Sequence, residues 1–438
     1  MSRVVGASAA ASADGLSIDH GGAIAVDTEQ LRDVGARVRG VAAQLDEARA
    51  AVDRAHALVV SEPELFSHVD GGALRRSGER LGSLRGELEE ACAGTLLMAE
   101  AFEVVELRAR AEALALTDAV AAGVIRIRLA RLLAGDERIG AIADGLVSGW
   151  EGRRFEGLGD QFDLGGLLPP VFMAGAIVGG ATGFGKVLPG MTLTGRGDPV
   201  RVTAGKTSRP SALTSVAGAF RRLPSGSAQV AVEKYTMADG ATRFVTYLKG
   251  TQNASPWHAG QAEPWDMKSN VQLYQGRTSA SYRATLEALD AAGAEPGDRV
   301  DVVAYSQSGM IATHLAMESE YDVSMQLTAG SPTESTLGDD QTLIQLRHTD
   351  DLVSGLAVGG SAAGTGSDDS FTASRVGDPH DGFQDLTLQA HGIETYIETA
   401  ELVDASDDPR AEALDDYWEE LGEAVEIERT EYHAERRR

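Results

Sequence analysis

A strand that runs into a sharp turn and then a helix is the feature that most constrains the fold of this chain. It lies in residues 299–316, which read RVDVVAYSQSGMIATHLA. Branched apolar residues precede the turn, and apolar residues at helical spacing follow it. Ser306 stands at the apex, where its hydroxyl would clear the backbone beside the amide groups of a helix start. This pattern indicates a nucleophilic serine, although ordinary turns rich in Ser and Gly share it.

The residues beside Ser306 differ in part from the G-x-S-x-G turn that carries a nucleophilic serine in many hydrolases. Ala304 and Ser308 stand where that motif has glycine, and Gly309 follows them. Small side chains are required there because a large one would collide with the adjoining strand and helix. Ser308 is a rival nucleophile, on the helix side of the turn.

Composition limits the classes of function. A length of 438 residues predicts two or three structural units. With 43% apolar and 24% charged residues, the composition is typical of a soluble globular protein. The formal charge of -27 would repel phosphate backbones and argues against nucleic-acid binding. The single cysteine, Cys92, excludes an intrachain disulfide.

Three glycine-rich or alanine-rich stretches resemble targeting or binding segments but lack the required features. Residues 1–20 have no continuous apolar core of the secretory type, so we expect a flexible segment and, by default, a cytoplasmic protein. Residues 167–184 are long enough for a membrane span, but their prolines and glycines favour a packing segment. Residues 179–186, GGATGFGK, fit the spacing of a phosphate-binding loop, but Val187 stands where a hydroxyl is needed. We expect a connector there.

The amino-terminal region has the pattern of long paired helices. Residues 27–58 and 74–105 carry apolar side chains at heptad spacing, separated by a break with proline and glycine. This predicts an antiparallel helical hairpin, and its seam could also pair with a helical partner protein or a second copy. No group of residues in this region suggests chemistry.

The carboxyl-terminal half alternates between strands and helices. The turn Asp239-Gly240 between two strand-like runs predicts a β-hairpin. We expect strands at 299–305, 323–329 and 341–348 and helices at 277–292 and 308–319. This order predicts an α/β fold with a mostly parallel sheet covered on both faces. The expected domains are a flexible start over 1–20, a helical domain over 21–160, a connector over 161–190, an α/β domain over 191–405 and a charged helix or tail over 406–438.

A nucleophilic Ser306 needs a histidine base and an acid that orients it. In the α/β-hydrolase arrangement both partners come later in the chain, with the acid first. Asp350 and Asp351 follow the expected strand 341–348, at the sheet edge where active sites form. His391, where a loop rejoins an ordered segment, is the favoured base. The other histidines after Ser306 are His314, His348, His380 and His433, of which His348 and His380 are rival bases.

Four motifs in order resemble the triacylglycerol-lipase-like branch of the α/β-hydrolases. They are AYSQSGM at 304–310, LTAGSP at 327–332, DLV at 351–353 and HGIETY at 391–396. The resemblance covers roughly 190–405 and implies an α/β-hydrolase fold, a triad of Ser306, Asp351 and His391, and hydrolysis of small-molecule or lipid esters. It implies no metal and no cofactor.

The same resemblance assigns an oxyanion hole. KGT at 249–251 follows a strand, which implies that the backbone N–H groups of Thr251 and Gln307 hold the oxyanion. Trp257 and Trp265 lie in the next loop and could form an aromatic wall for an acyl chain, or pack over the sheet.

A long loop at 358–382 is rich in Gly, Ser and Asp and is typical of a lid, a binding loop or disorder. Its aspartates do not have the spacing of calcium ligands, so we expect them to be solvated. They are Asp368, Asp369, Asp378 and Asp381.

The amino-terminal hairpin also resembles the small helical proteins exported by actinobacterial type VII systems. Trp150-Glu151-Gly152 spells their Trp-x-Gly motif, but it lies after the hairpin and not between its helices. This resemblance supports a second reading, in which the helices bind a partner, with or without export, and the hydrolase fold is a scaffold.

Overall fold

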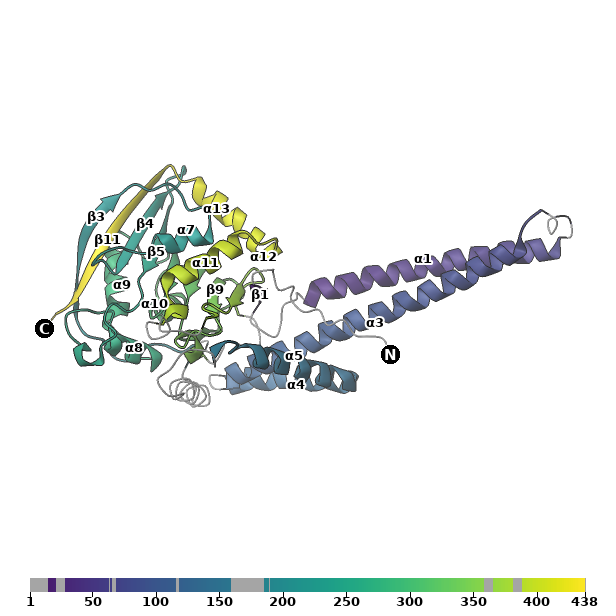
Figure 1. Ribbon diagram of the computed structural model, residues 1–438, viewed down its shortest axis with the longest axis horizontal. Coiled ribbons are helices and arrows are strands. Elements are labelled where there is room, and N and C mark those ends of the chain that lie inside the picture. Colours follow the sequence, from purple (N-terminus) through teal and green to yellow (C-terminus); the bar gives the residue numbers. More distant parts are fainter. Residues whose placement is uncertain are drawn as a thin grey trace. The chain divides into compact units, whose positions relative to one another are not determined.

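The computed structural model describes residues 15–20, 28–62, 64, 68–115, 118–158, 185–188, 190–357, 365–380 and 388–437. The chain is mixed α/β, with helices in its amino-terminal part and a nine-stranded sheet (Figure 1). It divides into two compact units. We call residues 26–108 and 123–146 the helical unit, and residues 1–25, 109–122 and 147–438 the sheet unit.

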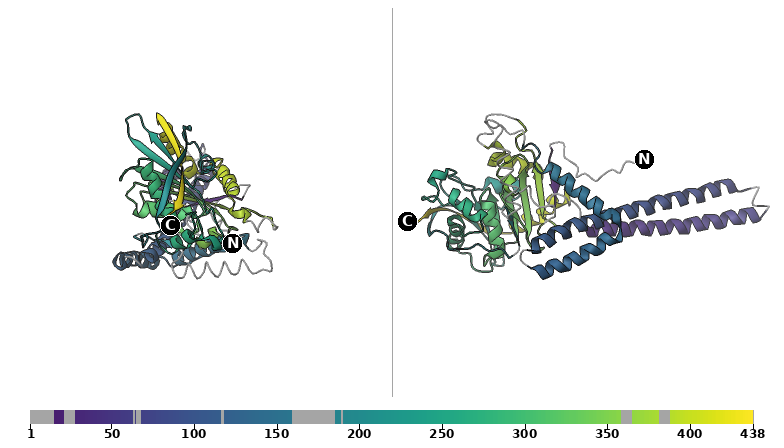
Figure 2. Two further views of the ribbon diagram at one scale, coloured as in Figure 1. Left: turned by 90° about the vertical axis from the view of Figure 1, so that its left-hand side faces the viewer. Right: turned by 90° about the horizontal axis from the view of Figure 1, so that it is seen from below.

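The helical unit is built on two long antiparallel helices. Helix α1 (Thr28–Ser61) packs along α3 (Gly71–Ala115), as the two ribbons in Figures 1 and 2 show. The helices approach closely at Gly35, where a Cβ would lie 2.9 Å from Leu96 Cδ2 and would make the leucine side chain shift. Cys92 is buried at this crossing and donates from Sγ to the Gly35 carbonyl at 3.2 Å. It therefore packs as a small core residue.

A buried carboxylate ties three helices of this region together. Glu103 on α3 binds Arg32 on α1 and Arg128 on α4 (Ala119–Gly135). Helix α5 (Glu137–Arg153) follows α4 after a short break at Asp136, whose side chain accepts from the Arg138 backbone N–H at 2.9 Å. Trp150-Glu151-Gly152 thus lies near the end of α5 and not in a turn between paired helices.

The sheet is mixed, with the order β1-β10-β9-β7-β6-β5-β4-β11-β3. The central pairs β5–β6, β6–β7, β7–β9 and β9–β10 are parallel, and the outer pairs are antiparallel. The strands are β1 (Ser17–Asp19), β3 (Val200–Ser208), β4 (Val230–Thr236), β5 (Thr242–Leu248), β6 (Arg299–Tyr305), β7 (Met325–Ala329), β9 (Thr342–His348), β10 (Phe371–Arg375) and β11 (Glu426–Arg436). A separate short pair joins β2 (Lys186–Val187) to β8 (Glu334–Ser335).

Both faces of the sheet are covered. Alternate residues of each strand point to opposite faces, so Val245 and Tyr247 of β5 join one core cluster while Phe244 and Leu248 join the other. The first cluster includes α7 (Val216–Arg221), α11 (Ile393–Asp404) and α13 (Leu414–Gly422), and the second includes α8 (Met267–Tyr274), α9 (Ala280–Ala291) and α10 (Ser308–Glu318). The expected α/β class is confirmed, and the sheet is mixed.

The carboxyl-terminal region differs from the predicted charged helix or tail over 406–438. Helices α12 (Pro409–Glu412) and α13 are followed by β11, which lies inside the sheet between β4 and β3. The sequence of this strand, EIERTEYHAER, is rich in charged residues and therefore did not predict a strand. Two of its arginines, Arg429 and Arg436, are buried because they pair with the carboxylates of Glu233 and Asp266.

Two shorter elements also differ from expectation. Residues 17–19 form the edge strand β1 against β10, although we predicted a flexible segment over 1–20. Helix α8 lies in the predicted loop before 277, where Asp266 caps it by accepting from the Ser269 N–H at 3.0 Å. Both elements are too short for a clear hydrophobic period.

Several predicted segments lie outside the described residues. These include the possible membrane span at 167–184, most of the connector at 161–190, most of GGATGFGK at 179–186, and Asp381. In the part of the chain that the structure describes, none of the helices has the length and apolar character to cross a membrane.

Candidate active site

Ser306 occupies a strained turn between β6 and α10. Its φ is 56°, in the left-handed region that residues other than glycine rarely adopt. Its backbone N–H donates to the Ala329 carbonyl of β7 at 2.8 Å, which holds the turn in place. Gly309 is required by a close approach, because a Cβ there would lie 2.5 Å from the Ser331 side chain. The turn thus pushes the Ser306 hydroxyl beyond the end of β6.

The structure brings Ser306, His391 and Asp351 into one hydrogen-bonded chain. His391 Nε2 lies 2.8 Å from Ser306 Oγ, and His391 Nδ1 lies 2.7 Å from Asp351 Oδ2. Ser306 and Asp351 follow the carboxyl ends of β6 and β9, and His391 ends the short turn η5 (Gln389–His391) before α11. The ionised Asp351 carboxylate accepts a hydrogen bond from His391 Nδ1–H. His391 Nε2 then carries no proton and can accept a hydrogen bond from the serine hydroxyl.

The environment of Asp351 favours its ionised form. Burial would raise the pKa of this carboxyl, but the nearby His391 and the hydrogen bonds from His391 and Tyr396 outweigh burial and lower the pKa below its usual value. The Tyr396 hydroxyl donates to Asp351 Oδ2 at 2.7 Å. The carboxylate therefore stays charged beside the imidazole at neutral pH.

The neighbouring Asp350 has a different role. Its two carboxyl oxygens accept from the backbone N–H groups of Gly377 and Asp378 at 2.7 and 2.8 Å. Burial raises the pKa of Asp350, and these two hydrogen bonds oppose that effect. Of the two aspartates left open by the strand-end pattern, only Asp351 contacts His391.

Aromatic residues fix the His391 ring. The Tyr305 ring stacks on it, with centroids 5.3 Å apart, and the Tyr305 hydroxyl donates to the His391 carbonyl. Gly330 must lack a side chain, since a Cβ there would lie 2.9 Å from His391 Cε1. The sequence patterns assign no role in the site to Tyr305 or Tyr396, although Tyr396 belongs to the HGIETY motif.

The rival bases do not reach Ser306. His348 is buried, with Nδ1 2.6 Å from the Ala390 carbonyl and Nε2 2.7 Å from Thr399 Oγ1. His314 is buried on α10 beside Glu318, and His433 lies on β11. His380 is exposed in the loop after β10. Within the described residues, His391 is the imidazole that hydrogen-bonds to Ser306.

The predicted oxyanion donors lie beside each other. A Cβ on Gly250 would lie 3.0 Å from Ser306 Cβ, so the strand end before Thr251 closely approaches the turn. Thr251 Oγ1 is 3.4 Å from Gln307 Oε1, and it accepts from Asn270 Nδ2 at 2.8 Å. In the described part of the chain, neither the Thr251 nor the Gln307 backbone N–H has an acceptor. Both groups are thus available to a ligand oxygen.

Ser308 and Trp265 form a buried structural pair. Trp265 Nε1 donates to Ser308 Oγ at 2.9 Å, and Ser308 Oγ donates to the Lys249 carbonyl. The Ser308 hydroxyl is fully buried and its proton is engaged, which argues against Ser308 as the nucleophile. Trp265 has 0% exposure and its ring packs in the core, which is the second of the two alternatives that the sequence left open for it. Trp257, on η2 (Pro256–His258), is 90% exposed.

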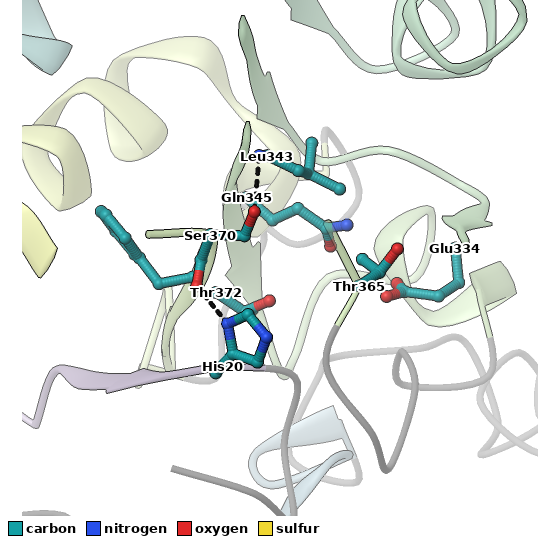
Figure 3. Close-up of a pocket in the computed structure, with 8 residues that line it drawn as sticks. His20, Glu334, Leu343, Gln345, Thr365, Ser370 and Thr372 are labelled. Carbon is teal, nitrogen blue, oxygen red and sulfur yellow. Dashed lines mark hydrogen bonds between the residues drawn. The ribbon is translucent and has the colours of Figure 1, made fainter. Parts of the chain in front are cut away.

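A separate small cavity lies among β1, β8, β9 and β10 (Figure 3). Its volume is about 10 Å³, enough for one water molecule. His20 and Glu334 face it, and His20 Nδ1 donates to the Ser370 carbonyl. None of its lining residues belongs to the Ser306 site. Among the described residues, no group of three His, Cys, Asp or Glu side chains is arranged to hold a metal ion.

Comparison of the chain with protein-family models, with curated proteins and with solved structures found no match in any of the three.

Proposed function

We propose that the protein is a serine hydrolase with an α/β-hydrolase fold that cleaves carboxylic esters. The observation that carries this proposal is the chain of hydrogen bonds from Asp351 through His391 to Ser306, with lengths of 2.7 and 2.8 Å. The strained turn at Ser306 and the two free N–H groups beside it add independent support.

The reaction that fits this geometry proceeds in two halves. Ser306 Oγ attacks the ester carbonyl carbon while His391 Nε2 takes the serine proton, and the N–H groups of Thr251 and Gln307 stabilise the oxyanion. When the tetrahedral intermediate collapses, the C–O bond to the alcohol breaks and His391 returns the proton to the alkoxide. Water then attacks the acyl-Ser306 ester with His391 again as base, which releases the acid and restores the enzyme.

The test compares two serines that stand two positions apart. Hydrolysis of p-nitrophenyl acetate and p-nitrophenyl octanoate is measured for the wild-type protein, Ser306→Ala and Ser308→Ala. We expect Ser306→Ala to lower kcat by about 10³-fold or more. Ser308→Ala should lower kcat by no more than about 10²-fold, because it removes the hydrogen bonds to Trp265 and Lys249 but leaves the nucleophile in place. Full activity in Ser306→Ala would contradict the proposal.

A further inference from the structure

Arg436, near the end of β11, donates five hydrogen bonds to a single segment of the sheet unit, and its Nε also lies 3.0 Å from Asp198 Oδ2. Its Nη1 donates to the carbonyls of Gln261 and Glu263 at 3.0 and 2.6 Å, and to Asp266 Oδ2 at 2.8 Å. Its Nη2 donates to Asp266 Oδ1 at 2.7 Å and to Ser269 Oγ at 2.9 Å. The segment 260–270 is therefore folded around one guanidinium group.

This ion pair is shielded from water. The side chains of Arg436 and Asp266 are 4% and 1% exposed. Removing one partner of a buried pair leaves the other charge without compensation, which destabilises the local structure strongly. The position of segment 260–270 thus depends on Arg436.

The same segment contacts both halves of the oxyanion hole. The Trp265 carbonyl accepts from the Gln252 N–H at 2.8 Å, directly after Thr251. Asn270 donates to the Thr251 side chain at 2.8 Å. On the other side, Trp265 Nε1 donates to Ser308 Oγ at 2.9 Å, directly after Gln307. Segment 260–270 therefore bridges the residues next to both N–H donors.

We propose that Arg436 is a positioning residue for the oxyanion hole. Through Asp266 and Trp265, it holds the Thr251 and Gln307 backbone amides at the spacing that the transition state requires. This inference rests on the proposed function. Small errors in the position of these N–H donors should lower kcat strongly, since removal of one oxyanion donor lowers kcat by about 10²–10³-fold. Strand β11, which the charged sequence did not predict, thus supports the site although it does not contact the substrate.

Arg429 on the same strand offers a matched control. It is also a buried arginine, and its Nη1 donates to Glu233 Oε1 at 3.0 Å. Its partners are Glu233, Glu431, the Arg222 carbonyl and the Tyr247 ring, none of which lies in segment 260–270. Replacement of Arg429 should destabilise the sheet unit without moving the oxyanion hole.

The experiment measures Arg436→Met, Arg436→Lys and Arg429→Met in the full chain. Active sites are first counted with a fluorophosphonate, so that loss of folded protein is separated from loss of rate. We expect Arg436→Met to lower kcat per active site by about 10- to 100-fold, with KM changed by less than about threefold. Arg436→Lys should lose less, because it keeps the charge but not the several directed hydrogen bonds. Arg429→Met should keep kcat per active site.

Amide hydrogen exchange gives a readout that does not depend on activity. We expect faster exchange at Gln252 and Asn253, whose N–H groups bind the Trp265 carbonyl, in the Arg436 variants but not in Arg429→Met. Unchanged exchange and rate in both Arg436 variants would overturn the inference, as would an equal loss in Arg429→Met. If Arg436→Met does not fold, Arg436→Lys is judged by the same criteria. A wild-type protein that does not react with the fluorophosphonate would instead contradict the proposed function.

Discussion

The sheet unit and the helical unit bury polar residues very differently. In the helical unit, Glu103 is the buried charged side chain among the described residues, and it serves to pair α3 with two arginines. In the sheet unit, buried polar residues are numerous, and a group of them converges beyond the ends of β6 and β9 around Ser306. Burial of polar groups costs free energy unless each is satisfied. The two units therefore differ in how much of their buried polar surface must be satisfied by hydrogen bonds and ion pairs.

The largest effect should come from the acid of the triad. Asp351→Asn keeps the shape of the side chain but no longer favours the correct tautomer of His391, so we expect kcat to fall by about 10³–10⁴-fold. Asp350→Asn is the matched control, since Asp350 binds the backbone of Gly377 and Asp378. It should lower stability and keep kcat within about tenfold. If both variants lost ester hydrolysis equally, Asp351 could not be assigned as the acid in preference to Asp350.

Truncation in the core of the helical unit should separate stability from activity. Phe102 on α3 is 6% exposed, and Phe102→Ala should cost about 3–5 kcal/mol in the unfolding free energy of that unit. Ester hydrolysis should be unchanged, because the site lies in the sheet unit. Urea denaturation followed by circular dichroism and by activity tests this. A parallel loss of kcat would show that the helical unit supports the site.

The pH dependence of stability should also arise from a residue of the sheet unit. Burial lowers the pKa of His348 to about 4 from 6.5. The unfolded chain therefore binds a proton that the folded chain excludes, so this contribution is complete above pH 6.5 and is lost as the pH falls from 6.5 towards about 4. The difference corresponds to about 3 kcal/mol. Denaturation across this range should show a flatter profile for His348→Gln than for the wild type, and equal slopes would contradict the assignment.

The smallest effect should come from the exposed apolar residues of the helical unit. Leu58 on α1 is 60% exposed, and Leu58→Gln should change stability by less than about 0.5 kcal/mol if the helices act alone. Analytical ultracentrifugation of wild type and variant adds a test of self-association. A dimer that Leu58→Gln dissociates would show that the exposed face of α1 also pairs between chains.

Hydrophobic periodicity predicted the elements around the site because those strands and helices are buried and uninterrupted. The β6 strand, the turn at Ser306 and α10 follow from alternation and helical spacing, and Asp239-Gly240 predicted the β4–β5 hairpin. Strand β11 did not follow, because its buried positions include arginines that pair with carboxylates distant in the sequence. No local pattern reveals such a partner.

The residues of the candidate site also divide into those that the sequence predicted and those that it left open. The motifs identified Ser306 and His391, but the strand-end pattern could not separate Asp350 from Asp351, because adjacent side chains point in different directions. The sequence also left two alternatives open for Trp265, a wall of the substrate site or packing over the sheet. An aromatic residue in a polar loop has the same sequence signature whether it lines a site or is buried, and here its Nε1 binds Ser308.

The most direct test of the account is fluorophosphonate labelling of the full-length wild-type protein, followed by peptide mapping. We predict one label per chain on Ser306, with none on Ser308, and loss of the label in Ser306→Ala. The absence of labelling, or a label on another residue, would contradict the central claim and favour a scaffold whose helices bind a partner.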